Sequence, residues 1–253
     1  MNKVVFIGAG PGDPELITLK GKRYLEQADI VIYAGSLLNP EILKYAKPSA
    51  KLYDSAKMSL PEVLKVMIEG IKTDKAVARV HDGDPSFYGA IQEQMDALDK
   101  EKIEYFRVPG VSCLQGGAGA LNRELTLPNI SQTVIITRPE GRTPVPEAES
   151  ISKLAQHQAT MVIFLGTPHI AKVMEELQKG GYPKDTPVSV VYKATWPQQK
   201  IVKGTISDIV AKVKAAGITE TALIFVGKVM NPEAYDLSKL YDPKFTTGFR
   251  KGE

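Results

Sequence analysis

The sequence predicts an α/β protein made of two successive α/β domains, with a ligand cleft between them. Short apolar runs of strand length recur along the chain, and most end in loops rich in Gly, Pro or Asp. Segments with helical periodicity separate these runs. The composition shifts at residues 122–132, where a second series of strands and helices begins. We expect an N-terminal domain at 1–115, a C-terminal domain at 116–232 and a tail at 233–253.

The first half of the chain contains four strand-like runs, at residues 4–7, 30–33, 76–80 and 103–108. Continuous apolar runs of this kind are typical of parallel strands that are buried on both faces. Thr18 precedes an apolar periodic segment and is expected to cap a helix. Residues 40–75 carry two further helix patterns with polar joints.

The second half repeats the alternation. Its strand-like runs lie at residues 134–137, 161–165, 188–192 and 222–226. Intervening segments such as 170–179 have helical periodicity. The tail at 233–253 is polar with scattered aromatics, which is typical of a surface tail or a disordered end.

Composition excludes several classes of protein. Lys and Arg total 32 and Asp and Glu 29, so the net charge of +3 argues against a dedicated nucleic-acid binder. A single cysteine, Cys113, allows no intramolecular disulfide and favours a reducing, cytoplasmic setting. The first apolar run is too short for a signal peptide, and no stretch is long enough to span a bilayer. The three histidines lack metal-ligand spacing, so we expect no protein-bound metal.

The first glycine-rich loop, residues 8–14, resembles a dinucleotide-binding turn only in part. Its third glycine comes one residue early, and Pro11 removes a backbone N–H that a pyrophosphate would need. No P-loop or G-x-S-x-G motif is present, and nothing marks a covalent nucleophile. The residues therefore suit a reaction in which a cosubstrate brings its own reactive group.

The loop that follows the run at 76–80 is the predicted functional centre. It reads Asp82-Gly83-Asp84-Pro85 and joins a strand to a helix. In open α/β sheets ligands bind at the carboxyl ends of strands. A tight turn with an Asp that caps the next helix explains the same residues equally well.

The loop at residues 137–147 is the second candidate. Its three prolines hold it in shape, and Arg138 and Arg142 are suited to carboxylate recognition. A stiff connector with solvated charges is the alternative. A third loop carries the only tryptophan, Trp196, for which packing and ligand stacking both remain open.

Three motifs in order resemble the tetrapyrrole methylase family. They are the loop at 8–14, Gly83-Asp84-Pro85 followed by Tyr88-Gly89, and the stretch at 108–112. The resemblance covers residues 1 to about 230. It implies two α/β domains with S-adenosylmethionine bound between them, S-adenosylhomocysteine as product, and a homodimer.

The stretches at 137–147 and 191–197 resemble one branch of that family. They imply methylation of an anionic tetrapyrrole, cobalt-precorrin-4, at C11 to give cobalt-precorrin-5A in cobalamin biosynthesis. Metal-free precorrin-4, another ring position and a non-catalytic binding module remain alternatives. A ribosomal RNA substrate is disfavoured by the modest charge.

The resemblance also carries individual residues over. It implies cofactor contacts from Pro11, Asp82, Gly83, Asp84, Phe87, Ser112, Cys113, Leu165, Ala194 and Ala222. The sulfur of Cys113 departs from the family pattern and puts that contact in doubt. Arg138, Arg142 and Lys193 are expected to bind substrate carboxylates, with Arg79 and Arg123 as further candidates. Cobalt would enter within the substrate. No base for the departing proton is assigned, although Asp84 and His81 are candidates for a catalytic group.

Overall fold

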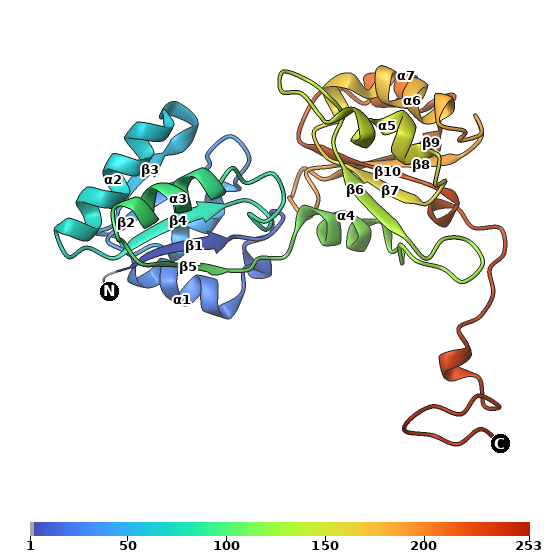
Figure 1. The fold of residues 1–253 in the computed structure, drawn as a ribbon, viewed down its shortest axis with the longest axis horizontal. Coiled ribbons are helices and arrows are strands. Elements are labelled where there is room, and N and C mark those ends of the chain that lie inside the picture. The colour runs from blue at the N-terminus through green and yellow to red at the C-terminus, as the bar shows by residue number, and fades with distance from the viewer. Residues whose placement is uncertain (1–2) are drawn as a thin grey trace. The chain divides into compact units, whose positions relative to one another are not determined.

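The chain forms two compact units. The computed structural model describes residues 3–253. One unit comprises the residues up to Ala120 together with Lys193–Lys200, and the other comprises Leu121–Tyr192 and Ile201–Glu253. Figure 1 shows a separate series of strands and helices in each unit. The segment Lys193–Lys200 therefore packs with a unit that is remote from it in sequence.

The first unit is built on a parallel five-stranded sheet of order β3-β2-β4-β1-β5. Its strands are β1 Val4–Gly8, β2 Ile30–Tyr33, β3 Lys51–Asp54, β4 Val77–His81 and β5 Tyr105–Val108. Every residue of β1 and β4 is buried, as the apolar runs predict for central strands covered on both faces. The four predicted strands are therefore confirmed, with small changes at their ends.

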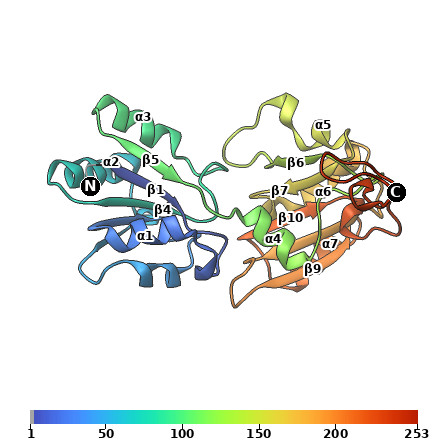
Figure 2. The ribbon, with the colours of Figure 1, turned by 90° about the horizontal axis from the view of Figure 1, so that it is seen from below.

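Helices cover both faces of this sheet. α1 (Leu19–Gln27) and η2 (Pro40–Tyr45) pack on one face, while α2 (Leu60–Lys72) and α3 (Gln92–Lys100) pack on the other. Figure 2 shows α1 and α3 on opposite sides of the strands. The predicted cap is confirmed, because the Thr18 hydroxyl oxygen accepts a hydrogen bond from the Gly21 N–H at 3.0 Å. The remaining elements are η1 Pro14–Leu16, η3 Ser55–Lys57 and α4 Cys113–Leu121.

The two helix patterns predicted within residues 40–75 are present as η2 and α2, but the sequence did not reveal the strand β3 between them. This strand pairs with β2 at the edge of the sheet. Its residues are exposed or half-buried, so no continuous apolar run marks it in the sequence. Its conformation depends on hydrogen bonds to a strand about twenty residues earlier.

The second unit contains a mixed five-stranded sheet of order β6-β7-β10-β8-β9. β6 and β7 are parallel, whereas β10 runs antiparallel to both β7 and β8. The strands are β6 Val134–Thr137, β7 Thr160–Ile163, β8 Pro187–Tyr192, β9 Lys200–Thr205 and β10 Ala222–Val226. The sequence did not reveal β9, which is an edge strand without a buried residue.

Three helices cover one face of the second sheet. α5 (Ile151–Ala155), α6 (Ile170–Lys179) and α7 (Ile209–Ala215) pack around the buried side chains of β7, β8 and β10. The helical periodicity at 170–179 is therefore confirmed. Short 3-10 turns complete the unit, at η4 Glu147–Glu149, η5 Thr167–His169 and η6 Lys228–Met230.

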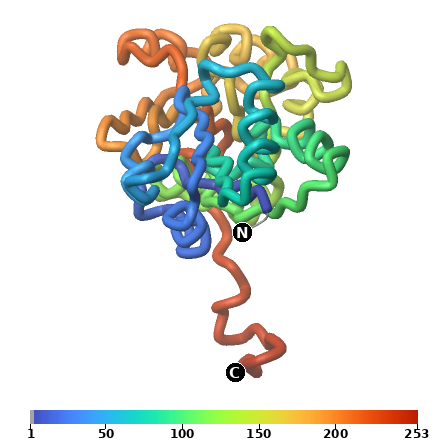
Figure 3. Tube along the Cα trace, turned by 90° about the vertical axis from the view of Figure 1, so that its left-hand side faces the viewer, coloured from blue at the N-terminus to red at the C-terminus, as the bar shows by residue number. Residues whose placement is uncertain are grey.

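The tail after η6 has little regular structure. It contains one 3-10 turn, η7 (Lys239–Tyr241), and forms the red end of the tube in Figure 3. Most of its residues are exposed. Its last turn is nevertheless closed, because Arg250 donates hydrogen bonds to the carbonyl oxygens of Leu240 (3.2 Å), Phe245 (3.5 Å) and Asp242.

No helix within residues 3–253 combines the length and the apolar character that crossing a membrane requires.

Candidate functional site

Glycine backbones from three loops meet at the carboxyl ends of β1, β4 and β5. We call Gly8, Gly10, Gly83 and Gly110 the glycine cluster. Gly10 and Gly83 form an antiparallel bridge, with N–H to carbonyl distances of 3.3 and 2.8 Å. A Cβ on Gly110 would lie 2.2 Å from the Gly83 carbonyl oxygen. Side chains are therefore excluded here, and the main chain is left bare where ligands bind in such sheets.

Asp84 fastens the loop after β4 to the loop after β5. Its Oδ2 accepts a hydrogen bond from the Gly110 N–H at 2.8 Å, and its Oδ1 accepts one from the Ser86 N–H at 2.8 Å. Burial opposes its ionisation, but these hydrogen bonds and the charge of Arg107 outweigh burial and lower the pKa of Asp84. Asp84 is thus an ionised clasp, which makes it a weak base near neutral pH.

The alternative in which an Asp caps the next helix is wrong. α3 begins after Ile91 and has no side-chain cap. The turn itself is real, since the Phe87 N–H donates to the Asp84 carbonyl oxygen at 3.2 Å. Phe87 is exposed on this loop.

Asp82 and Cys113 contact each other beside Gly83. The thiol of Cys113 donates to Oδ2 of Asp82 over 3.8 Å. Burial raises the pKa of the Asp82 carboxyl, whereas burial and the Asp82 charge raise the pKa of Cys113 to about 12. The thiol therefore stays protonated and is a poor nucleophile. The neighbouring Ser112 is buried, and its hydroxyl oxygen accepts a hydrogen bond from the Leu114 N–H at 3.3 Å.

His81 is the last residue of β4 and is buried. Burial and the charge of Arg79 lower the pKa of His81 to about 3, so its imidazole is neutral near pH 7. So low a pKa makes the imidazole a weak base. The prediction that His81 has a catalytic role remains a prediction.

The segment Lys193–Lys200 closes over the first glycine-rich loop. The Trp196 indole N–H donates to the Pro11 carbonyl oxygen at 3.0 Å, and the Thr195 hydroxyl accepts from the Asp13 N–H at 2.9 Å. A Cβ on Gly12 would lie 2.0 Å from the indole ring. The open question about Trp196 is therefore answered in favour of packing.

Two predicted residues, Ala194 and Lys193, belong to the same segment. Ala194 is buried, and its carbonyl oxygen would lie 2.9 Å from a Cβ on Gly12. The ammonium of Lys193 lies over the Trp196 ring, 4.8 Å from its centroid. The segment therefore brings both residues to the loop that carries Pro11.

Leu165 and Ala222 belong to neighbouring segments of the second unit. The Thr167 hydroxyl donates to the Ala222 carbonyl oxygen at 3.2 Å, which ties the loop after β7 to the start of β10. Leu165 is 56 % exposed and has a φ of +54°. A large apolar side chain held exposed on a strained backbone is an outlier that commonly marks a functional position.

The arginine loop between β6 and η4 gives its two arginines different environments. Arg138 donates hydrogen bonds to the carbonyl oxygens of Pro139 (3.2 Å), Thr143 (3.3 Å) and Pro144 (2.8 Å). Arg138 therefore holds the loop in shape. Arg142 is exposed and makes no ion pair or hydrogen bond with residues 3–253. Arg142 is thus the more available of the two for an anionic ligand.

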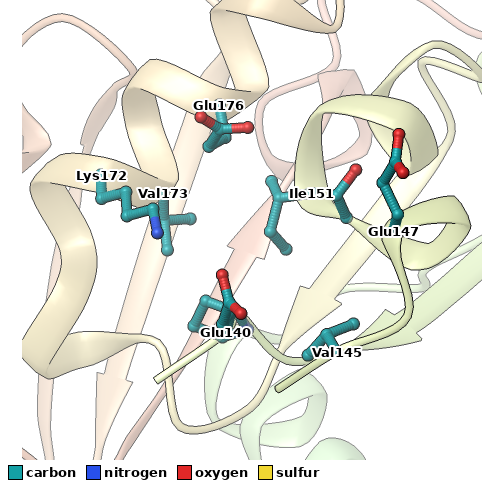
Figure 4. Close-up of a pocket in the computed structure, with 9 residues that line it drawn as sticks. Glu140, Val145, Glu147, Ile151, Lys172, Val173 and Glu176 are labelled. Carbon is teal, nitrogen blue, oxygen red and sulfur yellow. The ribbon is translucent and has the colours of Figure 1, made fainter. Parts of the chain in front are cut away.

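A cavity of about 350 Å³ lies between the arginine loop and helices α5 and α6. Figure 4 shows Glu140 and Val145 from the loop facing Lys172 and Val173 of α6. Three glutamates and one lysine line it, and neither Arg138 nor Arg142 does. The surplus of carboxylates would repel a polyanion, so this side of the loop does not suit an acidic ligand.

The structure thus assembles the predicted cofactor residues in two groups, each within one unit. Pro11, Asp82, Gly83, Asp84, Phe87, Ser112, Cys113 and Ala194 belong to the first unit, and Leu165 and Ala222 to the second. Sequence reasoning missed the packing roles of Gly110, Gly116 and Thr195. The signal available for the first two was the glycines themselves, one in the loop after β5 and one in the small-residue stretch that forms α4. No group of three or more His, Cys, Asp and Glu side chains in the described part of the chain could hold a metal ion.

The chain is similar to known proteins over almost its full length. A model of the Tetrapyrrole (Corrin/Porphyrin) Methylases matches residues 3–210. A cobalt-precorrin-4 C(11)-methyltransferase of Methanocaldococcus jannaschii is 56 % identical over 249 residues, which is 98 % of this chain and 96 % of that protein. A precorrin-4 C(11)-methyltransferase of Pseudomonas aeruginosa is 45 % identical over 99 % of both chains.

Solved structures give the same result. The X-ray structure of the cobalamin biosynthetic enzyme cobalt precorrin-4 methyltransferase, CbiF, has a TM-score of 0.89 and 46 % identity, covering 91 % of this chain and 97 % of that one. Uroporphyrin-III C-methyl transferase from Thermus thermophilus, complexed with S-adenosyl homocysteine, has a TM-score of 0.77 and 25 % identity, covering 92 % and 96 %.

Proposed function

Because the chain belongs to the tetrapyrrole (corrin/porphyrin) methylase family, we propose that it transfers a methyl group from S-adenosylmethionine to C11 of cobalt-precorrin-4. The product is cobalt-precorrin-5A, on the route to cobalamin. One observation carries the proposal, namely the 56 % identity to a cobalt-precorrin-4 C(11)-methyltransferase over nearly the whole of both chains. The relative named for metal-free precorrin-4 is less similar, at 45 % identity, which favours the cobalt-bearing substrate.

The glycine cluster fits the cofactor. Gly83 has a φ of +56°, and a Cβ there would meet the Cys113 sulfur at 3.1 Å, so the loop keeps its shape only with glycine. The N–H groups of Gly10, Gly83 and Gly110 already donate within the cluster or to Asp84, so the cluster offers a ligand close approach to the main chain and carbonyl oxygens as acceptors. Pro11, Asp82 and Ser112 border the cluster and would hold the cofactor from the first unit. Leu165 and Ala222 would contribute from the second.

Methyl transfer depends on alignment of the donor methyl group and the attacking ring carbon more than on acid or base catalysis. When bound, the sulfonium supplies an electrophilic methyl group that an electron-rich ring carbon can attack directly. The chain's own residues bind and orient the two reactants, an effect that can lower a barrier by about 7–11 kcal/mol. Neither the protonated Cys113 thiol nor the ionised Asp84 carboxylate is proposed to accept or donate a proton in the methyl transfer.

The substrate carries many carboxylates on its rim, and cobalt enters within it. Arg142 and Lys193 are proposed to contact these carboxylates, with Arg138 holding the arginine loop in shape and contributing its remaining donors. An exposed ion pair contributes only about 0–1 kcal/mol. Several contacts must therefore act together.

We also propose a homodimer that works in the cytoplasm. The dimer rests on the family to which the chain belongs, and the cytoplasm on the single cysteine, Cys113. Light scattering of the purified protein tests the first part. A mass equal to one chain of 27.6 kDa at micromolar concentration would contradict it.

Mass spectrometry of the product tests the function. Purified protein is supplied with S-adenosylmethionine and either cobalt-precorrin-4 or metal-free precorrin-4, and fragmentation locates the new methyl group. We expect methylation at C11 with the cobalt-bearing ring as the better substrate. A preference for the metal-free ring, or a methyl at another position, would overturn the assignment. Binding of S-adenosylhomocysteine without turnover of either ring would favour a non-catalytic binding module.

A further inference from the structure

Arg79 is a buried cation without a counter-ion. It is the middle residue of the central strand β4 and is only 6 % exposed. Its guanidinium donates to the Gln94 side-chain oxygen at 3.1 Å and to the carbonyl oxygens of Ile32 (3.3 Å) and Val80 (3.5 Å). All of these acceptors are neutral. No carboxylate among residues 3–253 forms an ion pair with Arg79. Its Nη2 atom donates a hydrogen bond to none of these residues.

His81 lies two residues further along β4 and therefore faces the same side of the sheet. It is 4 % exposed, and its Nε2 has no hydrogen-bond partner among the described residues. Buried polar side-chain atoms are almost always hydrogen-bonded in folded proteins. An unpartnered imidazole nitrogen beside an uncompensated guanidinium is thus a second exception at the same place.

The two exceptions have a common explanation. An isolated buried charge destabilises a fold, and an unsatisfied buried polar atom beside it destabilises the fold further. A fold carries such a cost where a bound ligand offsets it. A guanidinium with a spare N–H and an imidazole that can donate from Nε2 together match the two oxygens of one carboxylate.

We propose that Arg79 and His81 form a binding site for one carboxylate side chain of the tetrapyrrole substrate. This inference rests on the proposed function for the identity of the anion. The site lies at the carboxyl end of β4, directly before the loop that contributes Asp82, Gly83 and Asp84, where ligands of parallel sheets bind. It differs from the arginine loop, which belongs to the other unit.

A hydrogen-bonded chain links this carboxylate site to the loop that follows β4. Arg79 donates to Gln94, and Gln94 in turn donates to the Ala90 carbonyl oxygen at 2.9 Å. Ala90 and Tyr88 have φ values of +48° and +57°. The loop is therefore strained where Gln94 holds it, and its residues from Ser86 to Tyr88 are exposed. Ligand binding at Arg79 would change the position of Gln94 and, through it, the conformation of this loop.

The first test uses the wild-type protein and needs no variant. Of the three histidines, His157 and His169 are exposed, so the resonance of the buried His81 can be recognised in protein carrying isotope-labelled histidine. The probes are a diamagnetic cobalt(III) corrinoid with free acetate and propionate groups, cobyrinic acid, and its fully methyl-esterified form. We expect the acid to shift the His81 imidazole signals and the ester to leave them in place. No shift with the acid, or equal shifts with both, would overturn the proposal.

The second test measures affinity. Arg79→Met should weaken binding of the corrinoid acid at least tenfold and leave binding of the ester unchanged. Arg23→Met, at an arginine of the same unit that lies over the Tyr24 ring, is the matched control and should change neither. A loss shared by acid and ester, or by both variants, would refute a specific carboxylate contact.

S-adenosylhomocysteine binding separates this proposal from the proposed function. Arg79→Met should bind it as the wild type does, because Arg79 contacts none of the proposed cofactor residues except through the backbone of β4. Intact S-adenosylhomocysteine binding without an acid-specific shift of His81 would overturn the carboxylate site alone. Failure of the wild type to bind S-adenosylhomocysteine would instead overturn the proposed function.

Discussion

Two glycines on α4 provide a sharp test of how the first glycine-rich loop is held. Gly116 and Gly119 lie three residues apart on this helix. A Cβ on Gly116 would lie 2.6 Å from Cβ and 2.8 Å from Cγ of Pro11, whereas a Cβ on Gly119 would meet no atom within 4 Å. The same substitution, Gly→Ala, therefore probes contact with Pro11 at one position and helix propensity alone at the other.

The two substitutions should change the stability of the fold in opposite directions. Alanine is favoured over glycine inside a helix by about 0.5–1 kcal/mol, so Gly119→Ala should raise Tm by roughly 1–4 °C. Gly116→Ala has the same gain, but its methyl group must push the Pro11 ring about 1 Å to reach ordinary contact distance. Overpacking of this kind costs about 1–3 kcal/mol, so this variant should be less stable than Gly119→Ala by that amount.

Thermal unfolding and calorimetry with S-adenosylhomocysteine check both parts. Because Pro11 is a proposed cofactor contact, Gly116→Ala should also weaken S-adenosylhomocysteine binding by about tenfold, or 1.4 kcal/mol. Gly119→Ala should bind as the wild type does. Equal Tm values for the two variants would refute the close contact between α4 and Pro11. A lower Tm with unchanged affinity in Gly116→Ala would refute the role of Pro11 in binding.

Four single sites give further predictions. Gly83→Val should abolish S-adenosylhomocysteine binding in calorimetry. The control Gly217→Val, which also places valine at a positive φ, should lower Tm but bind normally. Normal binding by a folded Gly83→Val variant would contradict the placement of the cofactor at the glycine cluster. The pKa of Asp84 is lowered in the folded protein. The ionised carboxylate therefore stabilises the fold fully above the pKa of the unfolded chain, about 4, and this stabilisation is lost as the pH falls through the folded pKa. Asp84→Asn should therefore lower the free energy of unfolding at pH 7. The gap in unfolding free energy between the variant and the wild type should narrow below about pH 4. A gap that does not depend on pH would show that the charge of Asp84 does not stabilise the fold. With its pKa raised to about 12, Cys113 should react with iodoacetamide at pH 8 roughly a hundredfold more slowly in the folded than in the urea-unfolded protein, and equal rates would contradict the raised pKa. Arg142→Ala should weaken tetrapyrrole binding more than S-adenosylhomocysteine binding, and equal losses for the two ligands would count against the arginine loop.

Much of the fold follows from local patterns. The continuous apolar runs of β1 and β4 predicted central strands, because a strand covered on both faces must be apolar at nearly every position. The edge strands β3 and β9 escaped prediction, since their side chains are largely solvated and only their pairing partners define them. The antiparallel placement of β10 was equally hidden, because its apolar residues read the same in either direction.

The candidate site divides in the same way. The order and spacing of the glycine-rich loops are enough to indicate the family and to single out Gly83. The sequence could not show that Arg138 spends its donors on its own loop, that Trp196 packs on Gly12, or that Arg79 lacks a counter-ion.

By itself, then, the sequence determined the buried strands of the two cores, the glycine-rich loops that follow them and the family, because each of these depends on short local stretches of the chain. The tertiary structure alone decided which hydrogen-bond donors are already occupied and which remain available. That outcome depends on contacts such as Trp196 with Pro11, which join segments far apart in sequence and exist only once the chain has closed on itself.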